Sequence, residues 1–200
     1  PENIYMFDSG AIGAFWQQVS EATFDLDYFE YIIHKIPSDL ENIKGFMEGL
    51  SKIEYGYVGD VVSEYLLLQA SAFGGKQIYD LGCKFSNTSF RSYWKPTETS
   101  SRRSPVNPMM PMPSTLLDRV KKVVNEMQPI KATHTYAENI DFSKIKTDKE
   151  LVIYIDPPYK GTTGYKDNID LSLVINNAKC VGAKVFVSEY YKHSEDLVIL

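Results

Sequence analysis

The sequence predicts an α/β fold built on a parallel sheet, and three observations support this class. Residues 151–155 (LVIYI) are apolar or aromatic without polar alternation, which is typical of a strand covered by helices on both faces. Residues 3–8 (NIYMFD) have the pattern of a strand, and residues 11–22 after it that of a helix. From 130 to 192 strand and helix patterns alternate again, which indicates parallel strands.

The composition favours one folded core outside membranes. The chain has 200 residues, 44% of them hydrophobic, which is enough for one sizeable core with an inserted lobe. No apolar run approaches the length of a membrane span, and residues 1–10 do not resemble a signal peptide, so we expect no membrane partner. Cys83 and Cys180 are isolated, and no histidine has a partner at ligand spacing. We therefore expect reduced, buried thiols and no metal site.

The first strand ends at an acid, Asp8, and the helix over 11–22 follows it. In a sheet of this kind, an acid at a strand end accepts hydrogen bonds from the ribose hydroxyls of a nucleotide-like cofactor, and we prefer this role for Asp8. Two alternatives are that Asp8 caps the helix, or that Gly10 and Gly13 belong to a degenerate phosphate loop. The helix has one apolar stripe, formed by Ile12, Phe15, Trp16 and Val19.

The middle of the chain begins with helical patterns over residues 24–56, broken around Pro37. A strongly apolar helix then opens the segment 59–82, with core candidates at 66–68. Residues 74–76 (GGK) follow it and predict a tight turn at which a backbone can approach another molecule closely. A helix C-cap is the alternative.

Residues 85–113 differ in composition, because serine, threonine, proline and methionine dominate and no period is visible. This predicts a long loop or mobile lobe. Residues 84–131 carry nine basic and three acidic side chains, a net charge of +6 in a chain of net charge −5. Aromatic residues interleaved with basic ones suit a nucleic-acid surface, although a solvated face or a small satellite core is the ordinary alternative.

The last third of the chain supplies the remaining elements of the predicted sheet. Residues 114–127 form an amphipathic helix with Ser114 or Thr115 as its cap. A strand lies within 130–142, a helix over 169–182, and a further strand within 183–192.

The tetrapeptide D-P-P-Y at 156–159 follows the apolar strand directly, at the edge where open α/β sheets bind ligands. Pro157 and Pro158 stiffen the loop and leave its carbonyls free to accept hydrogen bonds. Asp156 and the Pro157 carbonyl can then take the hydrogens of a planar amino group, such as that of adenine, while Tyr159 stacks on the ring. The ordinary alternative is a proline turn with Asp156 as a cap and Tyr159 as packing.

Five features in this order together resemble a known family: Asp8 after a strand, S-A-F-G-G-K at 71–76, the basic lobe after it, D-P-P-Y-K-G-T-T-G-Y at 156–165 and V-F-V-S-E-Y at 185–190. The chain is similar, over almost its whole length, to the Dam-like DNA adenine-N6 methyltransferases of bacteria and phages. The resemblance implies a Rossmann-like sheet with an inserted target-recognition lobe, S-adenosylmethionine as cofactor and double-stranded DNA as partner. It also implies the cytoplasm of a bacterial or phage-infected cell, and leaves the oligomeric state open.

The resemblance assigns roles to individual residues in the catalytic and cofactor sites. The residues that would hold the flipped adenine are Asp156, Pro157, Pro158 and Tyr159. Asp156 would also touch the methionine part of the cofactor, and Asp8 would bind its ribose. Asp141 and Phe142 would contact the adenine ring of the cofactor, with Glu138 as an alternative.

The DNA-facing residues implied by the resemblance lie in the middle of the chain. They are Gly75, Lys76, Arg91, Lys95, Arg102 and Arg103. The matching division has an N-terminal core part at 1–70, a target-recognition lobe at 71–131 and a catalytic core at 132–200.

The chain departs from the family in two respects. The aromatic-x-Gly-x-Gly strand that precedes the Asp8 position in family members does not occur, nor do the strands that usually follow S-E-Y. We expect either a piece of such a methyltransferase or a degenerate relative. The alternative functions are a non-catalytic nucleic-acid-binding remnant, or amino-group methylation of RNA or protein, where the motif usually begins with Asn.

Overall fold

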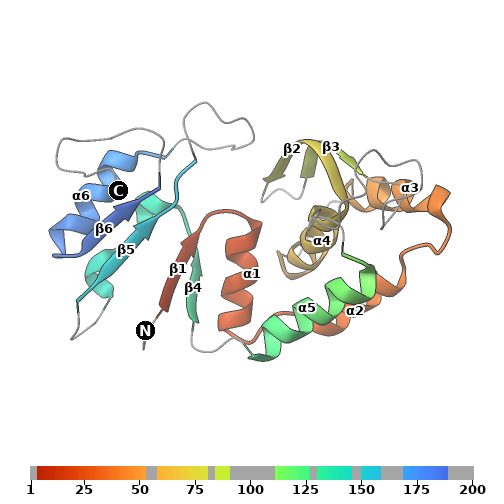
Figure 1. Cartoon of the computed structure of the whole chain (residues 1–200), viewed down its shortest axis with the longest axis horizontal. Coiled ribbons are helices and arrows are strands. Elements are labelled where there is room, and N and C mark those ends of the chain that lie inside the picture. The colour runs from red at the N-terminus through yellow and green to blue at the C-terminus, as the bar shows by residue number, and fades with distance from the viewer. Residues whose placement is uncertain are drawn as a thin grey trace. The chain divides into compact units, whose positions relative to one another are not determined.

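The computed structural model divides the chain into two compact units of mixed α/β structure, Pro1–His134 and Thr135–Leu200 (Figure 1). The predicted boundary at 131/132 lies close to this division, whereas the predicted 71–131 lobe belongs to the first unit. The structure describes residues 4–52, 58–80, 84–90, 111–126, 130–145, 150–158 and 169–188.

The first unit contains a parallel strand pair, β1 (Ile4–Asp8) and β4 (Ile130–His134). The register pairs Ile4 with Ile130 and Asp8 with His134, so the carboxyl ends of both strands lie together. Helix α1 (Ala11–Ser20) follows β1 and packs against β4. The strand ending at Asp8 and the helix after it are confirmed, as is the strand within 130–142.

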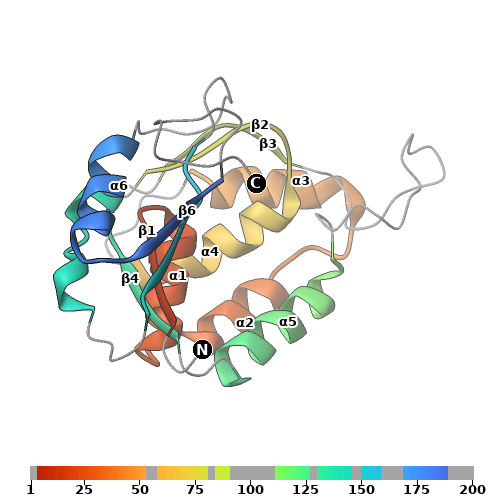
Figure 2. The same ribbon diagram turned by 60° about the vertical axis from the view of Figure 1, so that its left-hand side comes forward.

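Four further helices build the core of this unit: α2 (Leu26–His34), α3 (Leu40–Leu50), α4 (Val58–Ser71) and α5 (Pro113–Glu126). Asp25 and Asp39 cap α2 and α3 with their side chains, and the break between them contains Pro37, as predicted. The helices α2 and α5 lie side by side in both views (Figure 1 and Figure 2). The most deeply buried core side chains are Phe29, Met47, Val62, Leu67 and Leu68.

Helix α5 begins at Pro113, so the prediction that Ser114 or Thr115 caps it is wrong. Proline is suited to the first helical position, because that amide needs no partner within the helix. The Leu116 amide donates to the Met112 carbonyl at 2.9 Å and closes the first turn. The amphipathic pattern of the helix is confirmed, since Leu117 and Val120 are buried.

An antiparallel hairpin, β2 (Ala72–Asp80) and β3 (Lys84–Phe90), corrects two sequence predictions. Residues 74–76 lie within β2 instead of forming a tight turn, and residues 85–90 form a strand instead of a loop. The register of the hairpin is irregular on both sides of Gly75. Glycine inside a strand is typical of such irregular positions, which explains why G-G was mistaken for a turn.

The second unit contains the parallel pair β5 (Val152–Ile155) and β6 (Lys184–Val187), with α6 (Leu171–Cys180) between them in the chain. Two short 3-10 turns, η1 (Ala137–Asn139) and η2 (Phe142–Lys144), precede β5. Both strands and the helix were predicted. The core of this unit is formed by Phe142, Ile155, Leu171, Val174, Ile175 and Ala178.

The prediction that the strand at 151–155 is covered on both faces is wrong. Val152 is 55% and Tyr154 67% exposed, whereas Ile155 is buried and Ile153 half-buried. Ile153 and Ile155 share the face that packs into the core with α6. An uninterrupted apolar run therefore does not by itself require cover on both faces.

The described residues were searched for a membrane-spanning helix and for a metal site. No helix among them has both the length and the apolar character needed to cross a bilayer. They also contain no group of three or more His, Cys, Asp or Glu residues arranged to hold a metal ion. Cys180 is a free thiol but is exposed at the end of α6, which corrects the expectation of burial; Cys83 lies outside the described residues.

A buried acid in α4, Glu64, has no counterpart among the sequence predictions. It is 2% exposed, and the Tyr28 hydroxyl donates to its Oε1 at 2.6 Å. Its Oε2 has no hydrogen-bond partner in the described structure. Burial raises the pKa of the Glu64 carboxyl to about 7, and the Tyr28 hydrogen bond opposes this only in part.

We predict that this carboxyl makes the protein less stable as pH rises. The folded state keeps the proton up to about pH 7, whereas the unfolded chain releases it near the ordinary value of 4.5. The contribution is therefore complete below pH 4.5 and is lost as pH rises to 7, by at most about 3 kcal/mol. Urea unfolding at pH 5 and pH 8 measures the loss, and Glu64→Gln should reduce it. The control Glu48→Gln removes a carboxyl from the surface of α3, and a similar effect there would contradict the assignment.

Candidate active site

The carboxyl ends of β5 and β6 bring two sequence motifs together. Asp156 follows β5 directly and Ser188 follows β6 directly, and the register pairs Ile155 with Val187 just before them. The Ser188 hydroxyl donates a short hydrogen bond to Asp156 Oδ1. The Ser188 amide donates to the Ile155 carbonyl at 3.0 Å. The D-P-P segment and the serine of S-E-Y thus share one site, although they are 32 residues apart.

The local fold explains this meeting. Because β5 and β6 are parallel neighbours joined through α6, both strands end at the same edge of the sheet. Pro157 is buried and Pro158 half-buried, whereas the neighbouring Asp156 is exposed. The prolines thus anchor a loop that presents a carboxylate outward. Tyr159 lies outside the described residues.

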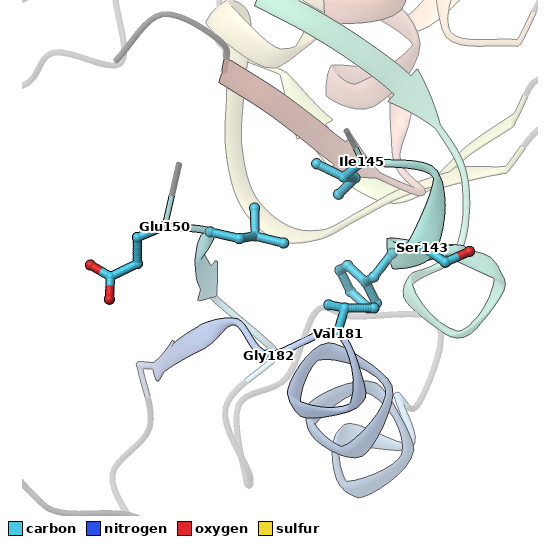
Figure 3. Close-up of a pocket in the computed structure, with 7 residues that line it drawn as sticks. Ser143, Ile145, Glu150, Val181 and Gly182 are labelled. Carbon is cyan, nitrogen blue, oxygen red and sulfur yellow. The ribbon is translucent and has the colours of Figure 1, made fainter. Parts of the chain in front are cut away.

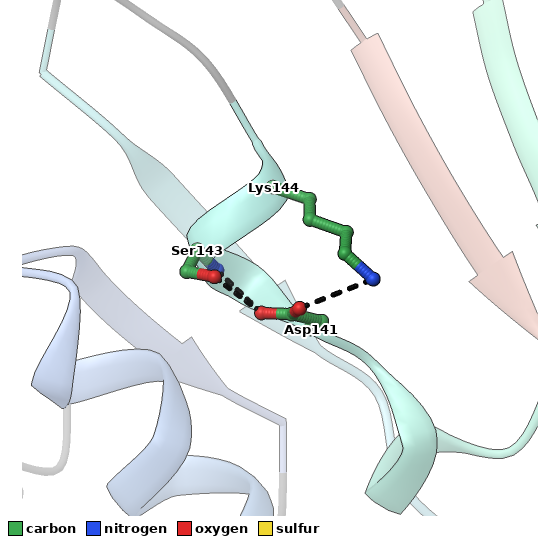
Figure 4. A network of polar contacts seen from close by, with 3 residues as sticks. All are labelled: Asp141, Ser143 and Lys144. Atoms are coloured by element: carbon green, nitrogen blue, oxygen red, sulfur yellow. Dashed lines mark hydrogen bonds and ion pairs between the residues drawn. The ribbon is translucent and has the colours of Figure 1, made fainter.

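Asp141 lies in the same unit and caps η2 (Figure 4). Its carboxylate accepts hydrogen bonds from the Ser143 hydroxyl at 2.5 Å and the Ser143 amide at 3.2 Å. Lys144 Nζ lies 3.3 Å from Oδ2. The Ser143 hydroxyl, followed by Lys144, lowers the pKa of the Asp141 carboxyl, so the group is an ionised acceptor at neutral pH.

Phe142 and Glu138, the other two residues assigned to the cofactor's adenine, have structural contacts. The Phe142 side chain is 5% exposed and packs in the core beside Ile155. The group it can offer a ligand is its backbone amide, since the first amides of a helical turn lack partners within that turn. Glu138 Oε1 accepts from the Asp170 amide at 2.9 Å, just before α6. Both acids thus have partners within the unit: Glu138 through Oε1, and Asp141 through both carboxylate oxygens.

A pocket of about 360 Å³ is lined in part by η2 and lies at the opposite edge of the strand pair (Figure 3). Glu150 and Leu151 precede β5, and Val181 and Gly182 precede β6, so the pocket is at the amino ends of the strands. Asp156 and Ser188 lie at the carboxyl ends. The pocket is thus distinct from the D-P-P edge. Its lining consists of Phe142, Ser143, Ile145, Glu150, Leu151, Val181 and Gly182.

Asp8, in the first unit, is held at the carboxyl end of β1. The Gly10 amide donates to Asp8 Oδ1 at 2.6 Å, a bond that closes a local turn. The N-cap of α1 is Gly10 and has no side-chain cap bond, so Asp8 is not the helix cap. Gly13 lets α1 approach the strand end, because a Cβ at this position would lie 2.3 Å from the Asp8 carbonyl oxygen.

Three residues beside Asp8 were not assigned to the site from sequence. His134 Nε2 lies 2.9 Å from the Ser9 carbonyl oxygen, and Gln17 Oε1 accepts from the His134 amide at 2.7 Å. On α4, burial raises the pKa of the Tyr65 hydroxyl, and the negative charge of Asp8 raises it further. These neighbours are revealed by tertiary contacts. The sequence gives one hint only for His134, because the predicted strands of β1 and β4 end at Asp8 and near His134.

For the residues predicted to face DNA, the structure describes no side-chain contacts. Gly75 and Lys76 are placed only as backbone of β2. The other candidates, Arg91, Lys95, Arg102 and Arg103, lie outside the described residues. The structure thus brings Asp156 together with Ser188, places Asp141 and Phe142 in the same unit, and places Asp8 in the other unit.

Comparison with known proteins does not identify a family. No protein-family model matches this chain, and no curated protein matches it.

Proposed function

We propose that this protein transfers a methyl group from S-adenosylmethionine to the N6 amino group of adenine in double-stranded DNA. The proposed scaffold is a Rossmann-like sheet with an inserted recognition lobe, acting in the cytoplasm of a bacterial or phage-infected cell. One observation carries the proposal: the carboxylate of a D-P-P-Y motif stands at the carboxyl edge of a parallel strand pair and accepts a hydrogen bond from the serine of S-E-Y. These two motifs are among the features on which the sequence resemblance rests, and Asp156 of the first is hydrogen-bonded to Ser188 of the second.

The chemistry of this edge suits an exocyclic amino group. Asp156 is an acceptor, and the Pro157 carbonyl beside it can accept as well. Two acceptors directed at the two amino hydrogens orient the nitrogen lone pair away from the protein and toward a methyl donor. S-adenosylmethionine supplies an electrophilic methyl group on a sulfonium. Transfer would form the bond from the amino nitrogen to the methyl carbon as the carbon–sulfur bond breaks, leaving a neutral thioether, and the nitrogen would then release one proton to water.

The donor and acceptor pattern of the cofactor fits the described acids. Asp141 is kept ionised by Ser143 and Lys144, so it can accept from the amino group of an adenine ring. Asp8 presents a carboxylate at a strand end, where it can accept from ribose hydroxyls. Each of the two units thus contains one of the acids that the resemblance assigns to the cofactor.

The decisive experiment measures cofactor binding and methyl transfer separately. Calorimetry with S-adenosylmethionine tests the cofactor site, and radiolabelled methyl transfer is followed on duplexes with and without adenine. The proposal requires binding and adenine-dependent incorporation. Binding of duplex without cofactor binding supports the non-catalytic remnant, and incorporation only into RNA or protein supports those substrates. Either outcome contradicts the proposal.

The DNA partner is tested by the salt dependence of binding. If Arg102 and Arg103 neutralise phosphates, Arg102→Ala/Arg103→Ala should reduce the slope of log affinity against log salt by about two. Titration of a labelled duplex at several salt concentrations gives the slopes of variant and parent. Equal slopes would mean that these two arginines do not contact phosphates.

Ser188→Ala is predicted to reduce methyl transfer by about 10- to 100-fold. A hydrogen bond to a charged group is worth roughly 1.5–3 kcal/mol, and here it sets the orientation of the Asp156 carboxylate. Single-turnover methylation with saturating cofactor and duplex measures the loss, and Ser188→Thr keeps a hydroxyl and should retain more activity. Ser172→Ala, on the exposed side of α6, is the control. An equal effect of Ser172→Ala would argue against a specific role of Ser188.

A further inference from the structure

Hydrogen bonds link the strand ends β1 and β4 to α1 around Asp8. The Gly10 amide bonds to Asp8 Oδ1 at 2.6 Å, His134 Nε2 bonds to the Ser9 carbonyl at 2.9 Å, and the His134 amide bonds to Gln17 Oε1 at 2.7 Å. Ser9 and Gly10 form the turn between Asp8 and the helix. Two of these bonds reach the turn, one from Asp8 and one from the His134 ring at the end of β4, and the third fixes His134 itself to Gln17 of α1.

The chemistry of each bond fixes the groups involved. A backbone carbonyl only accepts, so the His134 ring must carry a proton on Nε2 to bond Ser9. The Gln17 amide is oriented from both ends, because its Oε1 accepts from His134 and its Nε2 donates to Glu21 at 2.9 Å. A continuous chain of hydrogen bonds thus runs from Glu21 through Gln17 and His134 to the residue next to Asp8.

The turn has little else in the described structure to fix it. Ser9 is exposed, and α1 begins without a side-chain cap. The His134 contact joins positions 125 residues apart, so it couples the turn to β4 independently of the local chain. Removing it leaves two described hydrogen bonds of the turn, both local in the chain: the Asp8–Gly10 bond and the bond from the Ala14 amide to the Gly10 carbonyl at 3.2 Å.

We infer that His134 and Gln17 are positioning residues for the cofactor site, which hold the Ser9–Gly10 turn so that the Asp8 carboxylate faces the two hydroxyls of a ribose. This inference rests on the proposed role of Asp8. His134 would then affect the affinity for S-adenosylmethionine indirectly, by fixing the position of the Asp8 carboxylate. The reaction step and the contact with DNA do not involve these residues.

The test uses the full chain with His134→Ala, Gln17→Ala and Asp8→Ala, and His34→Ala as a histidine control on the exposed side of α2. We expect His134→Ala and Gln17→Ala to raise the Kd and KM for S-adenosylmethionine by about tenfold each, with kcat and the KM for duplex unchanged. His134→Gln, which keeps a donor on its side chain, should recover part of the affinity. In the Asp8→Ala background, His134→Ala should cost nothing further, because the two residues act as a unit.

A second readout does not need the cofactor. Exchange of the Gly10 amide hydrogen, followed by NMR, should be about tenfold faster in His134→Ala and Gln17→Ala and unchanged in His34→Ala. Absence of cofactor binding by the parent would refute the proposed function. Faster Gly10 exchange in His134→Ala and Gln17→Ala would still show that these two residues hold the Ser9–Gly10 turn. Parent-like Gly10 exchange in both variants overturns the inference, as does an equal loss of kcat and of affinity for both substrates. If His134→Ala does not fold, Gln17→Ala provides both readouts.

Discussion

Asp156→Asn is expected to reduce methyl transfer to adenine by about 10²- to 10³-fold, with duplex binding within about threefold of the parent. The two oxygens of a carboxylate are both acceptors, and one of them already accepts from Ser188. In the asparagine variant, the side-chain oxygen can still accept the hydrogen bond from Ser188. The NH₂ group then takes the place of the second carboxylate oxygen, which in the proposed function faces the substrate. Donor hydrogens would then face the amino hydrogens of the adenine. A misplaced polar group in such a site costs on the order of 3–4 kcal/mol in the transition state.

The measurement is single-turnover methylation of a duplex at saturating S-adenosylmethionine, with duplex affinity determined in parallel. Asp170→Asn is the matched control, because Asp170 lies in the same unit and caps α6 by accepting from the Leu173 amide at 3.0 Å. Asparagine caps helices about as well as aspartate, so this change removes a charge while keeping the fold. Near-parent turnover of Asp156→Asn would refute the role of Asp156, and equal losses in both variants would show a general effect of charge.

The fold could be predicted wherever the local sequence pattern favours the same helix or strand that the folded protein forms. The strand ending at Asp8, the helix after it and the β5–α6–β6 order have clear local patterns, an apolar run or an apolar stripe, and each was found close to its predicted position. The prediction was wrong where a residue type has two common uses. Glycine marks turns as well as irregular strands, as at Gly75, and proline can begin a helix, as at Pro113.

The site could be predicted only in part, for a similar reason. Asp156 at the end of an apolar strand was foreseen, since a strand end is a local feature. Its hydrogen bond to Ser188 depends on the order of strands in the sheet, which local pattern does not determine. The same holds for His134 and Ser9, which register alone brings together. Glu64 was missed because an acid in a helix is normally solvated, and only its neighbours reveal its burial.

Gly13→Ala is expected to destabilise the first unit by about 1–2 kcal/mol, which is the cost of overpacking less the gain in helix propensity from replacing a glycine. A Cβ at this position would lie 2.3 Å from the Asp8 carbonyl oxygen and 2.8 Å from both the Asp8 carbonyl carbon and its Cβ. Backbone atoms cannot rotate away as a flexible side chain can, so α1 must shift away from the end of β1. Overpacking of this kind costs roughly 1–3 kcal/mol or more, which exceeds the gain of at most about 1 kcal/mol from replacing glycine in a helix.

Gly45→Ala is the matched control for this prediction, because it places the same methyl group in the interior of α3 with nothing within 4 Å. There only the helix propensity changes, so we expect a stabilisation of about 0.5–1 kcal/mol. Urea unfolding of both variants and the parent gives the two free energies of unfolding, and their opposite signs separate close packing from propensity. A parent-like stability of Gly13→Ala would mean that α1 can move away from Asp8 without cost. Because the Asp8 turn is continuous with the start of α1, that result would also weaken the case for a rigid acceptor at this strand end.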